Sequence, residues 1–249
     1  MLSVIIIAKN EEPNIGRCLE SVKFADEIIV LDSGSTDRTI EIAQEYTDEI
    51  YSTDWQGYGI QKQRALSIAT SDWVLNLDAD ESLSDDLREE IIEAMKADEA
   101  DAYRIPIRMN FYNKALKYSG SPSRHVRLFK RSHGRYSDDY VHEKNILKPG
   151  SRIAKMESPI IHHSFRDLSH ALYKINKYSS YSARIRIEQN KRQGFIKTLL
   201  GAGWMFFRCF VIQRGFLDGK AGFLFAVFGA QGSFYRGMKQ IYKDNPDSF

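Results

Sequence analysis

The stretch WVLNLDADES, residues 73–82, decides how the fold is interpreted. An apolar run, Trp73-Val74-Leu75-Asn76-Leu77, stops abruptly at Asp78-Ala79-Asp80-Glu81. Three carboxylates therefore fall within four residues, where their charges repel one another. Either the chain simply leaves the core for water here, or a positive group lies beside the end of a buried strand.

Strands and helices alternate on both sides of this stretch. We expect strands at residues 2–8, 27–31, 49–52 and 72–77, and helices at residues 11–22, 38–46, 59–70 and 83–97, the last capped by Ser84. Apolar strands that alternate with amphipathic helices predict an α/β fold, with a mainly parallel sheet flanked by helices. Further strands are expected at residues 102–108, 126–131 and 160–163, and helices from about residue 168 onward.

Polar clusters follow three of the predicted strands. They are Asn10-Glu11-Glu12, Asp32-Ser33-Gly34 and Asp78-Ala79-Asp80. Because ligands of parallel α/β sheets bind at the carboxyl ends of the strands, these clusters are expected to meet in one crevice.

The acidic cluster is typical of a divalent-cation site. Asp78 and Asp80 flank a small residue, so that both carboxylates can approach one point. Hard oxygen ligands suit Mg²⁺ or Mn²⁺, which usually bind substrate phosphates as well. The alternative interpretation is an ordinary acidic turn, and the preceding strand and the two other clusters favour the metal.

The charge is divided unevenly along the chain. Residues 1–101 contain 8 Lys and Arg against 24 Asp and Glu, whereas residues 102–249 contain 27 against 9. This asymmetry predicts two parts with different partners, unless it reflects chance variation of solvated surfaces. Two distant cysteines, Cys18 and Cys209, favour a reducing compartment, and the apolar start is interpreted as a first strand rather than a signal peptide.

Three motifs together resemble family 2 glycosyltransferases of the GT-A fold. The motifs VIIIAKNEE, EIIVLDSGSTDRT and WVLNLDADE occur in the order and spacing of the nucleotide-sugar half of that family. Beyond residue 100, RLFKR, VHE, HHS and RGFLDGKAG resemble a bacterial branch, the WaaE-like lipopolysaccharide core glucosyltransferases. The resemblance implies a GT-A catalytic domain at residues 1–165, with a donor half (1–101) and an acceptor half (102–165). A basic amphipathic helical extension would follow at residues 166–249.

The resemblance also implies roles in donor binding. Asp32 would recognise the uracil or another base, and Glu11 would contact the nucleoside. Lys62 and Arg64 would meet the base or the phosphates. Each has a simpler alternative: a turn-capping acid for Asp32, a first-turn acid for Glu11, and an exposed helix face for the two cations.

For the metal, the resemblance implies Asp80 as principal ligand and Asp78 as a second ligand or ribose contact. Of the adjacent histidines His162 and His163, it favours His163 as a further ligand, against a structural role. The role of Glu81 stays open.

The reaction implied is a single displacement at the anomeric carbon, which inverts its configuration. A base must take the proton of the acceptor hydroxyl, and Glu143 is the candidate, with Asp138 and Asp139 as rivals.

Basic residues are expected to serve the acceptor. Arg124, His125, Arg127 and Arg131 would form a basic strand edge for an anionic acceptor, or else a merely solvated surface.

The C-terminal part is basic and rich in aromatic residues. Residues 174–220 hold ten Lys and Arg against two acids, and charges interrupt the apolar runs before about 20 residues have passed. We therefore expect helices that lie in a membrane interface, with a packed helical subdomain or a homodimer contact as the alternative.

The expected protein is a cytoplasmic enzyme on the inner face of the cell membrane. It would move a hexose, with glucose the expected sugar, from a UDP-sugar to a heptose of the lipopolysaccharide inner core, without a nucleic-acid partner. A polyprenyl-phosphate or protein acceptor stays open, as do a nucleotidyltransferase and a non-catalytic membrane scaffold. A nucleotidyltransferase would show a glycine-rich phosphate loop where Ala8-Lys9-Asn10-Glu11-Glu12 stands.

Overall fold

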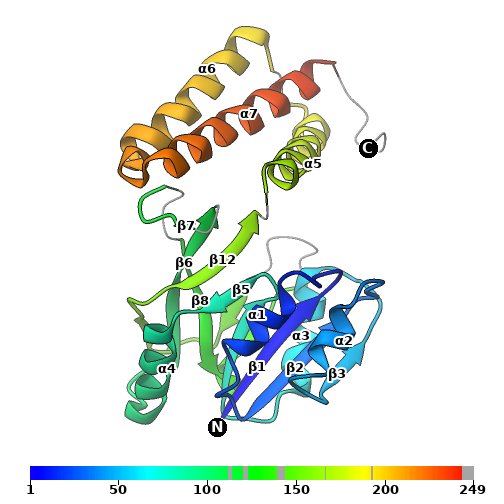
Figure 1. Cartoon of the computed structure of the whole chain (residues 1–249), viewed down its shortest axis with the longest axis vertical. Coiled ribbons are helices and arrows are strands. Elements are labelled where there is room, and N and C mark those ends of the chain that lie inside the picture. The colour runs from blue at the N-terminus through cyan, green and yellow to red at the C-terminus, as the bar shows by residue number, and fades with distance from the viewer. Residues whose placement is uncertain (112–113, 120–122, 139–143, 166, 192, 243–249) are drawn as a thin grey trace. The chain divides into compact units, whose positions relative to one another are not determined.

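The chain is organised as two compact units. A computed structural model describes residues 1–111, 114–119, 123–138, 144–165, 167–191 and 193–242. The first unit comprises Met1–Ile107 and Ser123–His163, and the second comprises Arg108–Pro122 and Ser164–Phe249 (Figure 1). The domain limits expected from the sequence, after residues 101 and 165, stay predictions.

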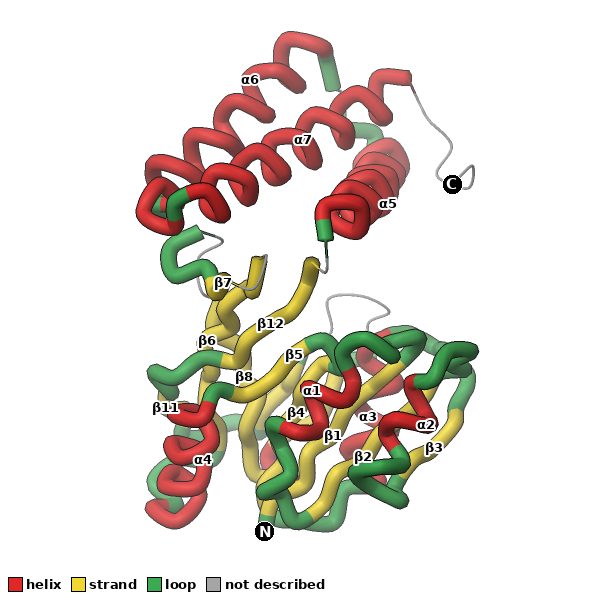
Figure 2. The backbone as a smooth tube through the Cα atoms, in the orientation of Figure 1, coloured by secondary structure: helices red, strands yellow, loops and turns green. Residues whose placement is uncertain are grey.

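The first unit is built on a long twisted sheet (Figure 2). Its parallel part has the order β3 (Ile50–Ser52), β2 (Glu27–Asp32), β1 (Leu2–Ala8) and β4 (Trp73–Asp78). The sheet continues through β8 (Ser123–Lys130), β6 (Ala102–Phe111), β12 (Ile160–Phe165) and β5 (Glu81–Leu83). The short strand β11 (Ile153–Lys155) pairs with β6, while β9 (Gly134–Tyr136) and β10 (Asn145–Leu147) form a separate ribbon. Strand β7 (Lys114–Ala115), which belongs to the second unit, pairs with the last residues of β6.

Helices cover both faces of the parallel strands. They are α1 (Ile15–Glu20), α2 (Thr39–Ala43), α3 (Tyr58–Ile68) and α4 (Asp85–Ala97), with a 3₁₀ turn η1 (Arg131–His133). Alternate residues of β1 enter different cores, because successive strand side chains point to opposite faces. Val4 and Ile6 pack with α1, α2 and α4, whereas Ile5 and Ile7 pack with α3. The predicted α/β architecture is therefore confirmed.

Two details show where local sequence signals succeed and fail. The hydroxyl of Ser84 accepts a hydrogen bond from the Leu87 N–H, so the predicted cap of α4 is confirmed. The strand Glu81–Leu83 was not expected, because three residues are too short to show an alternating pattern. Pairing with β12 creates this strand, with Glu81 opposite His162.

The second unit is mainly helical. It contains α5 (Leu168–Glu188), α6 (Phe195–Phe207), a π-helical turn η2 (Arg208–Ile212), a 3₁₀ turn η3 (Gly215–Asp218) and α7 (Lys220–Tyr242). Phe111, Leu116, Ala171 and Phe228 form its buried apolar cluster. The carboxylate of Asp218 accepts hydrogen bonds from three successive backbone N–H groups, of residues 117, 118 and 119. These bonds attach the RGFLDGKAG segment to residues 117–119, the turn that follows β7 (the β7 turn).

Candidate active site

The carboxyl ends of three parallel strands meet at one edge of the sheet. Asp32 at the end of β2 lies opposite Ala8 of β1, and Asp78 at the end of β4 lies opposite Ile7. This register brings the three polar clusters together, as expected from the sequence.

Asp32 shapes the loop that follows β2. Its carboxylate is buried, and Oδ2 accepts the backbone N–H groups of Gly34 at 2.8 Å and Ser35 at 2.9 Å. Gly34 adopts φ +85°, a conformation that glycine accepts without the steric cost borne by other residues. The carboxylate thus holds the loop 32–35 in place at the edge where a nucleoside is predicted to bind.

Glu11 belongs to a network that joins the loops after β1 and β2. Its carboxylate accepts a hydrogen bond from Asn14 Nδ2, and its backbone N–H donates to Thr39 Oγ1, each at 2.8 Å. Asn10 bonds across to the same loop through Ser35 Oγ. The network fixes two sides of the predicted donor pocket relative to each other.

The acidic stretch is paired with cations supplied by the chain itself. Asp78 Oδ1 lies 2.9 Å from Lys62 Nζ, and Asp78 Oδ2 lies 2.9 Å from Arg127 Nη2. The same Nη2 lies 2.8 Å from Glu81 Oε1, and Glu81 Oε2 accepts the Asp78 N–H. Glu81, 1% exposed, is therefore a buried partner of Arg127, which gives it the role that the sequence left open.

A β-bulge places Arg127 in this cluster. Tyr103 of β6 pairs with Leu128 and the next residue, Arg104, pairs with Val126, so Arg127 is the extra residue between them. Val126 and Leu128 consequently enter different cores, although strand alternation would put them on the same face. The side chain of Arg127 is thereby turned inward to Asp78 and Glu81.

The predicted basic edge is wrong for Arg127 and Arg131. Arg127 is 7% exposed, and Arg131 lies at the other end of β8, where its Nε donates to Ser71 O. Arg124 is paired with the exposed Glu157 at 3.0 Å. His125 lies near the start of β8, and desolvation by neighbouring groups together with the charges of Arg127 and Lys62 lowers its pKa.

These contacts shift the pKa values of Asp78, Glu81 and Arg127. Burial raises the pKa of Asp78, but the charges of Arg127 and Lys62 outweigh it and hold the pKa well below the usual range. Burial raises the pKa of Glu81 to about 7, against the opposing charge of Arg127. Both oxygens of Glu81 nonetheless accept hydrogen bonds, as an ionised carboxylate does. The acids raise the pKa of Arg127 despite its burial.

The second acid of the motif is paired with a histidine. His162 Nε2 lies 3.0 Å from Asp80 Oδ2. The sequence favoured His163, but adjacent strand residues point to opposite faces, and His163 Nε2 lies 2.9 Å from Ser82 Oγ instead. Burial opposes a charge on His162, yet the hydrogen bond and charge of Asp80 raise its pKa.

The residues present fit a divalent cation only in part. Among the described residues, no three His, Cys, Asp or Glu side chains are grouped as a metal site. Mg²⁺ and Mn²⁺ sites, however, often use one or two protein ligands together with substrate phosphates and water. Asp80 and His162, 18% and 31% exposed, supply one carboxylate and one imidazole that reach solvent. Both oxygens of Asp78 are already taken by cations.

The remaining predicted residues are placed as follows. Lys62, on α3, is 4% exposed and reaches the acids, whereas Arg64 turns to Asp54 at 2.9 Å. Gln61 was not predicted, because no motif marks it; it is fully buried and donates to Ser33 Oγ at 2.9 Å. Glu143 and its rival Asp139 lie outside the described residues, and Asp138 is described and exposed.

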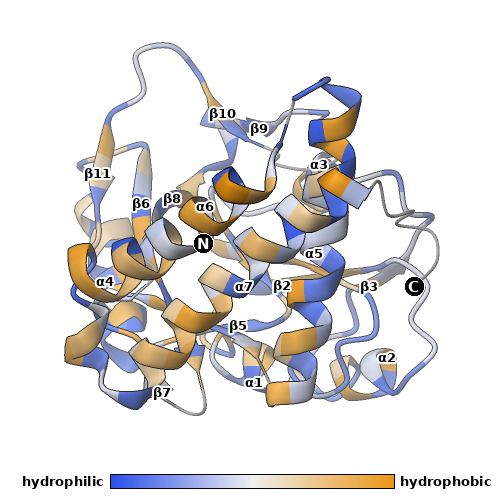
Figure 3. Cartoon of the chain, turned by 90° about the horizontal axis from the view of Figure 1, so that it is seen from above, coloured by the Kyte–Doolittle hydropathy of each residue, from blue (hydrophilic) through white to orange (hydrophobic). Residues whose placement is uncertain are grey.

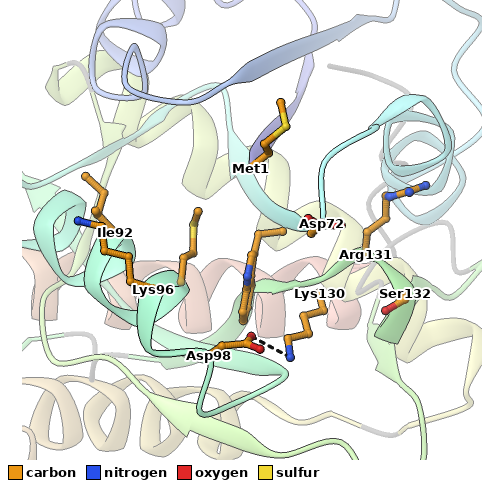
Figure 4. A pocket seen from close by; sticks show the side chains of 10 residues that line it. Met1, Asp72, Ile92, Lys96, Asp98, Lys130, Arg131 and Ser132 are labelled. Atoms are coloured by element: carbon orange, nitrogen blue, oxygen red, sulfur yellow. Dashed lines mark ion pairs between the residues drawn. The ribbon is translucent and has the colours of Figure 1, made fainter.

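A cavity of about 680 Å³ lies at the other end of the strands (Figure 4). Met1 and Asp72, which precede β1 and β4, line it together with Trp73 and Lys130. Lys130 is held by Asp98 at 2.9 Å, the contact marked in the figure. The cavity is therefore separate from the acidic edge.

Comparison with known proteins agrees with this geometry. The family model for glycosyl transferase family 2 matches residues 3–152. The lipopolysaccharide core biosynthesis glycosyltransferase LpsC of Rhizobium meliloti (strain 1021) is 34% identical over 254 residues, covering 97% of this chain and 92% of LpsC. An uncharacterized glycosyltransferase of Rickettsia bellii (strain RML369-C) is 32% identical over 248 residues, covering 94% of this chain and 84% of that protein.

A solved structure confirms the fold expected from the sequence motifs. The mannosyltransferase PcManGT of Pyrobaculum calidifontis, solved with GDP-Man and Mn²⁺, superposes with a TM-score of 0.54 at 13% identity. The match covers 98% of this chain and 88% of PcManGT. The GT-A fold is thus confirmed, and with 150 residues matched by the family model the chain belongs to glycosyltransferase family 2.

Proposed function

We propose that this glycosyltransferase moves a hexose, with glucose the expected sugar, from a UDP-sugar to a heptose of the lipopolysaccharide inner core. The observation that carries the proposal is the Asp78–Asp80 edge at the end of β4, joined to the loops after β1 and β2. The similarity to LpsC supports a core-oligosaccharide acceptor. A polyprenyl-phosphate or protein acceptor is the alternative to be tested beside it.

The donor site is made by the loops after β1 and β2 and by α3. Asp32 holds the base-binding loop, Glu11 lies at the nucleoside side, and Lys62 brings a positive charge to the edge. Arg64, paired with the exposed Asp54, is the outer cation of this helix. Its Nη1 also donates to the Asp54 carbonyl and to Gln61 Oε1. Because the ion pair with Asp54 is exposed and contributes little, a phosphate could replace it at small energetic cost.

Asp80 and His162 would hold Mg²⁺ or Mn²⁺, with Asp78 fixed between Lys62 and Arg127 as a positioning residue. When bound, the cation stabilises the negative charge that develops on the leaving diphosphate. In this assignment His162 replaces His163 as the histidine of the site.

The chemistry is one displacement. The acceptor oxygen forms a bond to the anomeric carbon while the bond from that carbon to the diphosphate oxygen breaks, and the configuration inverts. UDP leaves, and Glu143 takes the proton of the acceptor hydroxyl. Asp138 and Asp139 are the rival bases.

The enzyme is proposed to work on the cytoplasmic side of the inner membrane, at the membrane surface. Its acceptor would be carried by lipid, and the basic second unit would lie nearest to it.

Calorimetric binding of UDP, with and without Mn²⁺, tests the donor assignment. We expect metal-dependent binding by the wild type that Asp80→Ala removes. Glu157→Ala, an exposed acid paired only at the surface, is the matched control and should bind as the wild type does. Absence of UDP binding at every metal concentration would refute the UDP-sugar assignment.

The acceptor is tested next, with UDP-glucose and three acceptors: heptose-terminated core oligosaccharide, polyprenyl phosphate and a protein extract. Transfer to the heptose alone supports the proposal. Transfer to either of the others replaces it by the corresponding alternative.

A further inference from the structure

Large apolar side chains are exposed on the second unit, along α6, the two turns that follow it and the start of α7. Figure 3 colours much of α6 as hydrophobic. We define the apolar face by its exposed members: Phe195, Ile196, Leu199, Leu200, Trp204, Phe207, Val211, Ile212, Phe216, Leu217 and Phe223. Soluble monomers seldom expose apolar surface of this extent, and where it occurs it marks a contact with a protein or a membrane.

The face is what remains after α6 has packed on α7. Small residues of α7 allow this close approach: Gly229, Ser233 and Gly237 recur every four residues. A Cβ added at Gly237 would lie 2.4 Å from Thr198 Oγ1, and one at Gly229 would lie 3.4 Å from Met205 Cγ. α6 therefore buries Thr198 against α7, while most of its large apolar residues stay exposed.

Cations border the apolar face. Lys197, Arg208, Arg214 and Lys220 are all exposed, and within the described part of the chain none of them forms an ion pair. The second unit as a whole contains 17 Lys and Arg against 5 Asp and Glu. A symmetric dimer through this face would bring like charges together, because the same surface of each copy takes part. Anionic lipid headgroups would instead complement the cations.

The same charges indicate whether α6 lies on a membrane or crosses it. Among the described residues one segment, Phe195–Ile212, is apolar and long enough to cross by length and composition. Its 18 residues include Lys197 and Arg208, and Arg214, Asp218 and Lys220 follow closely. Only the ten residues 198–207 are uncharged, half of the roughly 20 that a spanning helix needs. An exposed apolar face bordered by cations is typical of a helix in the interface plane.

We infer that the apolar face docks on a bilayer containing anionic lipid, with α6 parallel to the surface and Trp204 and Phe207 inserted among the headgroups. This inference specifies the membrane contact on which the proposed location rests. It does not depend on which sugar or acceptor the enzyme uses.

Vesicle sedimentation of the full chain tests it. The wild type should pellet at least ten times more strongly with vesicles of equal phosphatidylglycerol and phosphatidylcholine than with phosphatidylcholine alone. We expect two double variants to lower vesicle binding at least tenfold each: Trp204→Glu with Phe207→Glu, and Arg208→Glu with Lys220→Glu. For the second, every basic residue near an anionic surface contributes about fivefold to binding. Ile153→Glu and Lys155→Glu, on exposed positions of β11, are the matched controls and should change binding less than twofold.

Circular dichroism and UDP calorimetry of each variant separate a failure of docking from a failure of folding or of the proposed function. Absence of vesicle binding by the wild type would overturn the inference. So would an apolar-face variant that turns a dimer into a monomer while vesicle binding is unchanged. Resistance of the bound wild type to both high salt and alkaline carbonate would also overturn it, in favour of a spanning segment.

Discussion

Replacement of Arg127 tests the central electrostatic feature of the site. Arg127→Met keeps most of the volume of the side chain but removes the guanidinium that contacts Asp78 and Glu81 at 2.9 and 2.8 Å. Lys62 still neutralises Asp78, whereas the buried Glu81 keeps only the Asp78 N–H among these contacts. Loss of one partner of a buried ion pair costs about 3–5 kcal/mol, and we expect a loss in this range at pH 8.

The loss of stability should depend on pH, because Glu81 becomes neutral when it binds a proton. Without Arg127 the folded-state pKa of Glu81, already raised by burial, rises further. A raised carboxyl pKa means that stability falls as pH rises from the unfolded-state pKa toward the folded-state pKa, by about 1.4 kcal/mol per pH unit. The destabilisation by Arg127→Met should therefore be smallest near pH 5 and grow toward pH 8.

Urea unfolding followed by circular dichroism at pH 5 and pH 8 measures this. Glu81→Gln should recover at least half of the loss in the Arg127→Met background at pH 8, because it removes the unpaired charge. Arg124→Met, which breaks an exposed pair with Glu157 and a part-buried hydrogen bond to the Met156 carbonyl, is the control and should cost at most about 2 kcal/mol. A loss from Arg127→Met no larger than this control, with no rescue by Glu81→Gln, would refute the reasoning.

Three further predictions concern the metal, the β7 turn and the helices of the second unit. His162→Ala should weaken Mn²⁺-dependent UDP binding by about tenfold or more and His163→Ala by less than about twofold, which calorimetry compares directly; equal effects would contradict the assignment. Asp218→Asn should cost about 2–3 kcal/mol in urea unfolding at neutral pH. Hydrogen bonds outweigh burial and lower the pKa of Asp218, so its contribution is present above the ordinary pKa and lost as pH falls through the folded value, and the difference from the wild type should shrink toward pH 3. Lys239→Met should cost about 2–3 kcal/mol, because the buried Nζ donates to Asn176 Oδ1 at 2.6 Å and to two serine hydroxyls of α5; an unchanged unfolding midpoint would show that these bonds do not stabilise the helices.

The elements that can be predicted from the sequence are those with a pattern that lies within one segment and extends over several residues. Strands β1, β2 and β4 are apolar along nearly their whole length because helices cover both faces, and Ser84 caps α4 through a bond to its own first turn. The convergence of the polar clusters follows from the parallel arrangement alone. For these features no contact distant in sequence needs to be known.

The elements that it misses depend on pairing between distant segments. Glu81 belongs to a strand only because β12, eighty residues later, pairs with it, and the same pairing decides that His162 faces Asp80. A shift of one residue would exchange His162 and His163, and no local pattern distinguishes the two. Arg127 reaches the acids because of a bulge defined against β6, so a strand prediction for residues 126–131 assigns its side chain to the wrong face.

The pairing of the three crowded acids bears on why the proposed donor site would use a divalent cation. Among the described residues Asp78 contacts Lys62 and Arg127, Glu81 contacts Arg127, and Asp80 contacts His162. With His162 protonated, three carboxylates thus face three cationic groups, so the edge is close to neutral before any ligand binds.

A sugar diphosphate would add two negative charges to this partly buried edge. The resident cations could not neutralise these charges, because they already pair with the three carboxylates. A divalent cation that displaces the proton of His162 and binds Asp80 would leave about one excess negative charge in place of two, and it would arrive with the donor rather than before it. Mn²⁺ alone should therefore bind weakly, and UDP should raise its affinity by the same factor by which Mn²⁺ raises the affinity for UDP. Calorimetric titration in both orders measures the two factors, and tight binding of Mn²⁺ without UDP would show that the edge is not neutralised from within.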